Sequence, residues 1–216
     1  MNDTYATIRA VHMGRPLRHE GPDPWVTAIV KTPVSGPVTL TELGLLGDGH
    51  ADLVNHGGPD KALCAYAFDH YPFWIAQLNR DTLQTGAFGE NLTVAGLVDA
   101  VACIGDVMTV GTATVQISQP RQPCWKLARL WMIEDFAQQV VQANRTGWYF
   151  RVIRGGTIEA GQPLVLVERP HPEWTVAAAN DVMHRGGHDP EASAALAAVP
   201  ALSLAWKQTL ERRLGR

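Results

Sequence analysis

Length, composition and charge exclude several classes of protein. The 216 residues are 46% hydrophobic and 18% charged, which is ordinary for a globular chain and excludes the disordered class. The formal net charge is −3 without a long basic run, so we expect no nucleic-acid polymer as a partner. There is no run of about 18 apolar residues and no apolar core of a signal peptide. We therefore expect a cytoplasmic protein with no membrane partner.

Short strands are predicted over most of the chain, from residue 25 to about 168. These segments are rich in β-branched residues and are bounded by glycine and proline turns. Their spacing favours a barrel or sandwich over a doubly wound sheet. Two helices interrupt the pattern, at about 70–78 and 133–143. The predicted strands are 25–31, 38–40, 61–66, 91–94, 107–110, 112–118 and 163–167.

A change of composition at Pro170 marks the start of a second segment. Three short helices are predicted there, at 176–184, 191–198 and about 203–214. Such a small segment cannot build a sufficient core of its own. We expect it to pack against the barrel or against another subunit, which suggests a homodimer. The predicted domains are 1–169 and 170–216.

The three cysteines do not form a recognisable framework. Their number is odd and none has CxxC spacing, so disulfides are not expected. Iron–sulfur clusters generally take four cysteine ligands, so we expect no cluster in this chain. Cys64 and Cys103 lie in apolar stretches and are interpreted as buried packing residues.

A glycine-rich segment offers a candidate anion site. Gly57 and Gly58 allow backbone conformations that bring successive N–H groups to one point. Lys61 follows four residues after Gly57 and adds a charge-assisted contact. The alternative interpretation is a tight turn between strands, in which His56 is a structural histidine.

A second candidate segment is Phe88–Leu92. Glu90 and Asn91 follow a turn glycine. They offer a carboxylate acceptor and an amide that both donates and accepts, which suits contact with a heterocycle. The alternative is a pair of turn-forming polar residues before a strand.

The third segment surrounds Cys124 with cations. Arg121 precedes the cysteine and Lys126 follows it, in a loop held extended by two prolines. Nearby cations stabilise a thiolate, and thiolates bind transition metals well. Two other interpretations stay open at this point: a buried structural cysteine, and a thiol-hydrolase pair with His56.

Taken in order, these segments resemble the MOSC domain, a family named after molybdenum cofactor sulfurases. The stretches that carry the resemblance are LTELGLLGDGHADLVNHGGPDKALCAY, FGENL, QISQPRQPCWKL and TGWYFRV. The tail, from EWTVAAANDVMHR to LSLAWKQTLERRL, resembles the addition found in a YiiM-like subgroup. The resemblance implies a mainly β fold with added helices: a bent, twisted β-barrel followed by a small three-helix C-terminal domain.

The same resemblance implies a molybdenum cofactor, in which the metal is carried by molybdopterin. It assigns Cys124 as the metal ligand. Lys61 and Arg121 are similarly implied as contacts of the pterin or its phosphate.

Further residues are implied as lining of the same cavity. Gly57, Gly58 and Asn91 are expected to bind the cofactor. His56 and Glu90 are expected to act in catalysis, because both residue types serve as general acids.

The implied activity is reduction of small N-hydroxylated compounds, such as 6-hydroxylaminopurine, to amines in detoxification. Because the chain carries no flavin or iron–sulfur module of its own, electrons would come from a separate flavoprotein or iron–sulfur protein. Two alternatives stay open. One is a carrier of the cofactor or of sulfur without turnover of its own, and the other is a binding or scaffold module with an inert Cys124.

Overall fold

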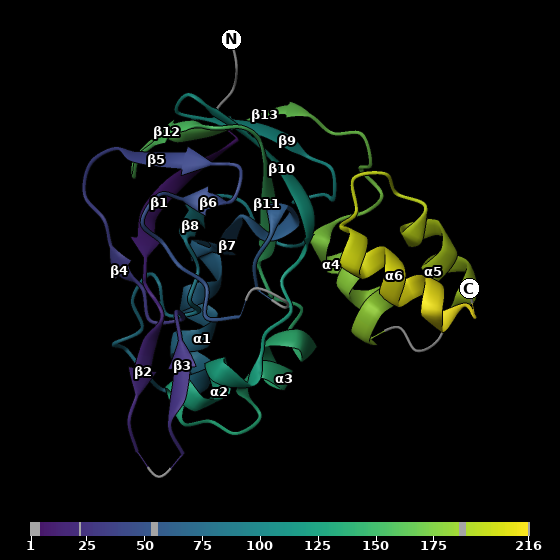
Figure 1. Cartoon of the computed structure of the whole chain (residues 1–216). Helices are drawn as coiled ribbons and strands as arrows, with labels where there is room; N and C mark the ends of the chain where they lie inside the picture. Colours follow the sequence, from purple (N-terminus) through teal and green to yellow (C-terminus); the bar gives the residue numbers. More distant parts are fainter. Residues whose placement is uncertain (1–4, 22, 53–55, 186–188, 216) are drawn as a thin grey trace.

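The computed structural model describes residues 5–21, 23–52, 56–185 and 189–215. Seven strands form a closed β-barrel (Figure 1), in the order β13-β9-β10-β11-β7-β8-β1. The barrel closes because β13 also pairs with β1. The predicted barrel fold is therefore confirmed. Its strands are β1 (Ala6–Met13), β7 (Leu63–Ala67), β8 (Leu92–Ala95), β9 (Val107–Val110), β10 (Ala113–Pro120), β11 (Trp148–Arg154) and β13 (Pro163–Glu168).

The side chains of the barrel strands explain why they close around one core. In β9, Met108 and Val110 are buried while Val107 and Thr109 are partly exposed. This two-residue alternation gives each strand an inner and an outer face. By contrast, β7 is buried at all five positions, because helices cover its outer side.

Three helices close one end of the barrel (Figure 1): α1 (Tyr71–Leu78), α2 (Trp125–Trp131) and α3 (Phe136–Gln142). The segment containing α1 connects β7 to β8, which run parallel and so require a crossover connection. The three helices share a second apolar core with the end of β7. Its buried members are Tyr66, Tyr71, Trp74, Leu83, Phe88, Leu127, Ala128, Phe136 and Val140.

Short outer strands complete the β structure. A hairpin of β2 (Leu17–His19) and β3 (Trp25–Thr27) extends from the barrel toward α2 (Figure 1). Elsewhere, β4 (Thr32–Pro33) pairs with β1. A separate three-stranded sheet contains β5 (Val38–Thr41), β6 (Gly44–Leu45) and β12 (Gly156–Ile158).

The C-terminal helices lie to one side of the barrel (Figure 1): α4 (Val176–Asn180), α5 (Pro190–Ala197) and α6 (Leu204–Arg213). A π-helical turn, Asp181–Arg185, follows α4. Side chains of Thr175, Asp189 and Ser203 cap the three helices by accepting backbone N–H groups. Buried residues of these helices belong to the same core cluster as the barrel. The expected packing against the barrel is thus observed, while the boundary at residue 170 stays a prediction.

Several element bounds differ from those that the sequence predicts. The predicted strand 25–31 ends at Thr27, because the following residues leave the sheet to line a cavity. The predicted strand 61–66 begins at Leu63, since Pro59–Lys61 form a short 3₁₀ helix, η1. Strand β1 was not predicted, because polar residues break up its apolar pattern. No helix within the described part of the chain is long and apolar enough to cross a membrane.

Candidate functional site

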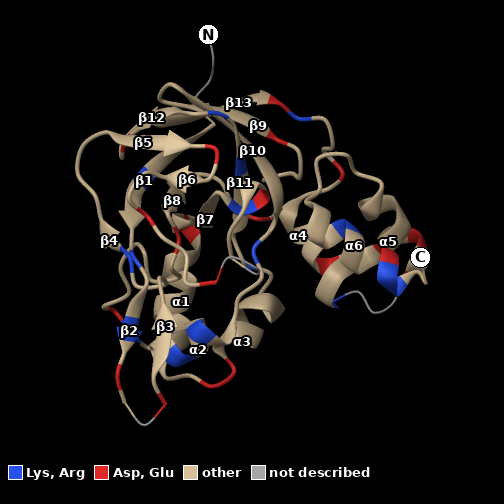
Figure 2. Ribbon diagram, viewed as in Figure 1, with Lys and Arg blue, Asp and Glu red and all other residues tan. Residues whose placement is uncertain are grey.

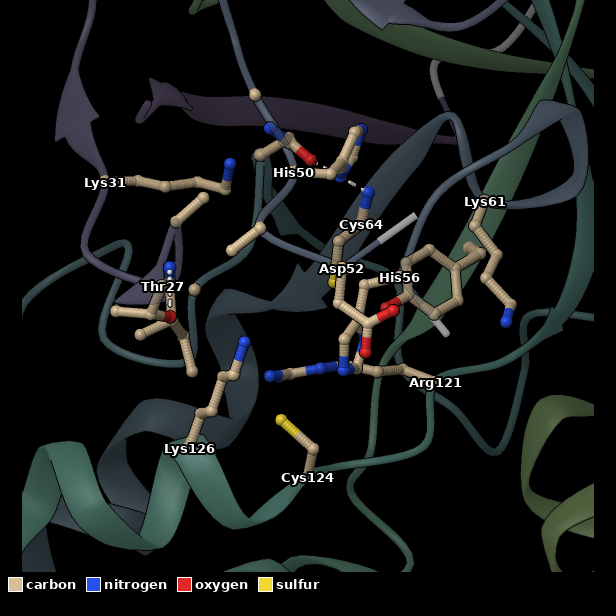
Figure 3. Close-up of a pocket in the computed structure, with 17 residues that line it drawn as sticks. Thr27, Lys31, His50, Asp52, His56, Lys61, Cys64, Arg121, Cys124 and Lys126 are labelled. Carbon is tan, nitrogen blue, oxygen red and sulfur yellow. Dashed lines mark hydrogen bonds between the residues drawn. The ribbon is translucent and has the colours of Figure 1, made fainter. Parts of the chain in front are cut away.

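An open cavity lies between the barrel and the start of α2 (Figure 3). It contains about 590 Å³ of space outside atoms, part of which is open solvent. Segments far apart in the sequence contribute to its wall. The lining residues are Thr27, Ala28, Ile29, Lys31, Gly49, His50, Ala51, Asp52, His56, Lys61, Cys64, Gly89, Asn91, Arg121, Cys124, Lys126 and Tyr149.

Cys124 stands at the rim of the cavity, where the extended chain after β10 turns into α2. Its backbone is extended, with φ −111° and ψ 168°, and it occupies the N-cap position of the helix. The thiol is free and only partly buried. Figure 3 shows the Arg121 and Lys126 side chains entering the cavity from opposite sides, above the Cys124 thiol in this view. The structure thus places the Cys124 thiol and the cations Arg121 and Lys126 in the lining of one cavity.

Basic residues concentrate beside this thiol. Along α2, Lys126 and Arg129 are basic and no residue is acidic (Figure 2). Lys31 also lines the cavity, but its ammonium already pairs with both Asp48 carboxylate oxygens, at 2.7 and 2.8 Å. The Lys31 charge is therefore balanced within the protein.

Arg121 is the side chain that most clearly requires a ligand. Its exposed fraction is 5%, and its backbone N–H donates to the Gly147 carbonyl at 2.9 Å. The guanidinium atom Nη1 is buried and has no hydrogen-bond partner among the described residues. A buried unpaired donor on a charged group is costly. An anion bound in the cavity would satisfy it.

His56, one of two histidines among the described residues that line the cavity, is held neutral. Burial lowers the pKa of His56 to about 4, with Arg121 acting in the same direction and Asp52 opposing. Burial also lowers the pKa of Lys61, against the opposing effects of Asp60 and Asp52. The predicted residues His56 and Lys61 thus face the same cavity as Cys124, in a region where additional positive charge is disfavoured.

Glu90 does not belong to the cavity, which corrects its predicted role. The carboxylate is fully buried in the turn before β8. Oε1 accepts hydrogen bonds from the Tyr71 hydroxyl at 2.5 Å, the Gly86 N–H at 2.8 Å and the Thr93 hydroxyl at 2.7 Å. Oε2 accepts the Phe88 N–H at 3.1 Å. Glu90 therefore holds a turn together instead of supplying protons to a ligand.

Asn91 lines the cavity, but its amide is already used. Oδ1 accepts the Cys64 N–H at 3.1 Å. Nδ2 donates to the His12 carbonyl at 3.2 Å and to Asp48 Oδ2 at 2.7 Å. Asn91 therefore ties β1, β7 and Asp48 together at the cavity wall, and its role as a cofactor contact stays a prediction.

The glycine pair also takes a different place from the one predicted. Gly58 has φ 91° and precedes η1, and its carbonyl accepts the Lys61 N–H at 3.0 Å. Neither Gly57 nor Gly58 is among the described residues that line the cavity. The tight-turn alternative describes Gly58 better, and the turn brings Lys61 into the cavity.

Cys64 and Tyr149 are among the lining residues that sequence reasoning missed. Cys64 and Tyr149 are directly opposite in the β7–β11 pair, so their side chains share one face of the sheet. Both are buried and line the cavity. Burial raises the pKa of the Cys64 thiol to about 11, which keeps it protonated. Strand pairing alone brings these residues together, and pairing cannot be read from local sequence.

The barrel, its helical addition and the thiol between cations together define the class of protein. The MOSC domain family matches residues 52–165, and the YiiM-like three-α-helix domain family matches residues 174–215. The chain belongs to the MOSC family. This membership relates its function to the molybdenum cofactor.

Three similar proteins illustrate the membership. YflK of Bacillus subtilis is 41% identical over 212 residues, covering 97% of this chain and 95% of that protein. The crystal structure of YiiM from Geobacillus stearothermophilus has a TM-score of 0.83 and 37% identity, covering 97% and 99% of the two chains. A protein of Gibberella moniliformis described as a reductase is 38% identical over 153 residues, which cover 69% of this chain and 27% of that protein.

The residues present fit a molybdenum–pterin cofactor. Its metal can take a soft thiolate ligand, and Cys124 offers an accessible thiol. Its phosphate can pair with a buried cation, and Arg121 Nη1 has no protein partner among the described residues. Those residues contain no group of three or more His, Cys, Asp or Glu side chains that could hold a bare metal ion. A metal at Cys124 would therefore be held mainly by the other ligands of a cofactor.

Proposed function

We propose that this protein is a molybdenum-cofactor-dependent reductase that converts N-hydroxylated compounds, such as 6-hydroxylaminopurine, to amines. The observation that carries the proposal is the shared cavity of the Cys124 thiol and the unpaired Arg121 guanidinium nitrogen. Membership of the MOSC family and the similarity to a protein described as a reductase support the same activity.

The proposal gives four cavity residues a role. Cys124 would be the protein ligand of the metal. Arg121 and Lys61 would hold the anionic end of the pterin, and Lys126 would balance charge beside the thiolate. The bound cofactor supplies the two-electron chemistry, while the protein binds, orients and tunes it.

Protons must also reach the substrate. Reduction of a hydroxylamine to an amine takes two electrons and two protons and releases one water. His56 is the titratable cavity residue retained from the sequence prediction, since Glu90 lies elsewhere. A bound anion would offset the cations that lower the His56 pKa and so make its ring a better proton carrier at neutral pH.

Electrons would come from a separate flavoprotein or iron–sulfur protein. An iron–sulfur cluster generally takes four cysteine ligands. This chain has three cysteines, and two of them are buried. A soluble chemical reductant can replace this partner in an assay.

The proposal is tested by following 6-hydroxylaminopurine conversion with protein from a host that makes the cofactor, using a reduced viologen dye as the electron source. We expect the unchanged protein to convert the substrate to adenine and Cys124→Ser to lose this activity. Cys103→Ser should keep the activity, because the Cys103 thiol is buried and is not among the described lining residues of the cavity. Cofactor bound without turnover would contradict the reductase and indicate a carrier.

A further inference from the structure

Helix α6 contacts the turn that carries the cavity residue Lys61. The contact runs through its neighbour Asp60. Asp60 Oδ2 accepts the N–H of Leu204, the first residue of α6, at 3.1 Å. Asp60 Oδ1 accepts Nε and Nη2 of Arg151 at 3.0 and 2.6 Å. Its carbonyl accepts the Ser118 hydroxyl at 2.5 Å.

These contacts matter because η1 is only three residues long. A single 3₁₀ turn has little stability of its own, so its position depends on its anchors. Asp60 joins the turn to three separate elements: β10 through Ser118, β11 through Arg151 and α6 through Leu204. Two of these anchors belong to the barrel, and one belongs to the C-terminal domain.

A second set of contacts reaches another cation of the cavity, Arg121. Asn180, at the end of α4, is fully buried and donates to the Thr146 hydroxyl at 2.6 Å. Asp99 Oδ1 accepts both the Thr146 hydroxyl, at 3.3 Å, and the Gly147 N–H, at 2.8 Å. The Gly147 carbonyl in turn accepts the Arg121 N–H at 2.9 Å.

We propose that the three-helix domain positions two cations of the cavity, Lys61 and Arg121. Through Asp60, α6 fixes the turn that carries Lys61, and through Asn180, α4 fixes the loop end that carries Arg121. Asp60 and Asn180 are positioning residues, since neither is among the described lining residues of the cavity. The identity of the ligand rests on the proposed function. The coupling of α4 and α6 to the positions of Arg121 and Lys61 does not.

One substitution removes the α6 contact with little other change. Leu204→Pro deletes the N–H that Asp60 accepts, and proline is well suited to the first position of a helix. Ser203, with φ −59° and ψ 148°, already has the conformation favoured before proline. The Leu204 side chain is 62% exposed, so Leu204→Ala is a matched control that keeps the N–H.

Amide hydrogen exchange of the full chain tests the coupling directly. We expect residues 56–63 to exchange about tenfold faster in Leu204→Pro than in Leu204→Ala, because a hydrogen bond to a charged group is lost. Asn180→Ala tests the second route at the amides of Arg121 and Gly147. Unchanged exchange in both variants would show that the helices merely pack on the barrel, and the inference would be wrong.

Binding of inorganic phosphate, measured by calorimetry, separates the coupling from the proposed function. We expect Leu204→Pro to bind phosphate about tenfold more weakly than Leu204→Ala. Equal binding despite faster exchange would overturn the positioning role. If the unchanged protein and Leu204→Ala bind no phosphate, the proposed anion site fails, while the exchange result still decides the coupling.

Discussion

Two neighbouring regions of the molecule handle buried polar groups in opposite ways. In the turn before β8, the Glu90 carboxylate accepts four hydrogen bonds from the protein. In the cavity, the buried Arg121 guanidinium keeps a nitrogen without a partner among the described residues. The satisfied group stabilises the fold, whereas the unsatisfied one is available to a ligand. Glu90 and Arg121, both predicted as site residues, therefore differ in what their buried charges do.

The largest expected effect comes from removing the satisfied group. Glu90→Ala would leave the buried hydroxyls of Tyr71 and Thr93 and two N–H groups without their acceptor. We expect a loss of about 3–5 kcal/mol in the free energy of unfolding, measured by urea denaturation. A loss below about 1 kcal/mol would contradict the structural role of Glu90.

Arg121→Met tests whether the unsatisfied guanidinium is a ligand contact. We expect binding of inorganic phosphate to weaken at least tenfold, since a desolvated cation contributes about 2 kcal/mol or more to binding an anion. The free energy of unfolding should stay within about 1 kcal/mol, because the substitution removes an unpaired charge and keeps an apolar side chain. Calorimetry measures phosphate binding, and denaturation of the same sample measures the free energy of unfolding. Strong destabilisation with unchanged phosphate binding would show that Arg121 is a structural residue and not a ligand contact.

The two cavity cysteines should differ in reactivity. Cys64 is buried and its pKa is raised to about 11, whereas Cys124 is partly exposed. We expect iodoacetamide at pH 7.5 to modify Cys124 at least about tenfold faster, as followed by peptide mass spectrometry. Faster modification of Cys64 would contradict the choice of Cys124 as the accessible thiol.

The smallest effect concerns the protonation of His56. Its folded pKa of about 4 lies below the usual value of 6.5, so the unfolded chain binds more protons between these values. The free energy of unfolding should therefore fall as pH decreases from about 6.5 to 4. His56→Gln should make this dependence shallower, and NMR titration should show the His56 pKa rising when phosphate binds. A pKa near 6.5 in the ligand-free protein would contradict the electropositive environment.

Local sequence signals predicted many of the short strands and the three C-terminal helices, because both depend on short-range patterns. Alternating burial along β9 involves only a few consecutive residues. Strand β1 escaped prediction, since its buried polar residue His12 interrupts the apolar pattern. The family resemblance added the closed-barrel architecture, which those patterns left undecided.

The site was predicted only in part. Cys124, Arg121, Lys61 and His56 meet in one cavity, as expected. The sequence did not predict that the Glu90 carboxylate is buried. Its hydrogen-bond donor Tyr71 lies on a helix some twenty residues earlier in the chain, and local sequence does not show such a contact. Nor could it place Cys64 beside Tyr149, since their proximity comes from pairing of distant strands.

Molybdenum content tests the central claim most directly. It is measured per chain by elemental analysis, after expression in a host that makes the cofactor, for the unchanged protein, Cys124→Ser and the control Cys64→Ser. The account predicts near-stoichiometric metal in the unchanged protein and in Cys64→Ser, and little in Cys124→Ser. Equal molybdenum in all three would contradict Cys124 as the ligand, and none in any of them would contradict the cofactor itself.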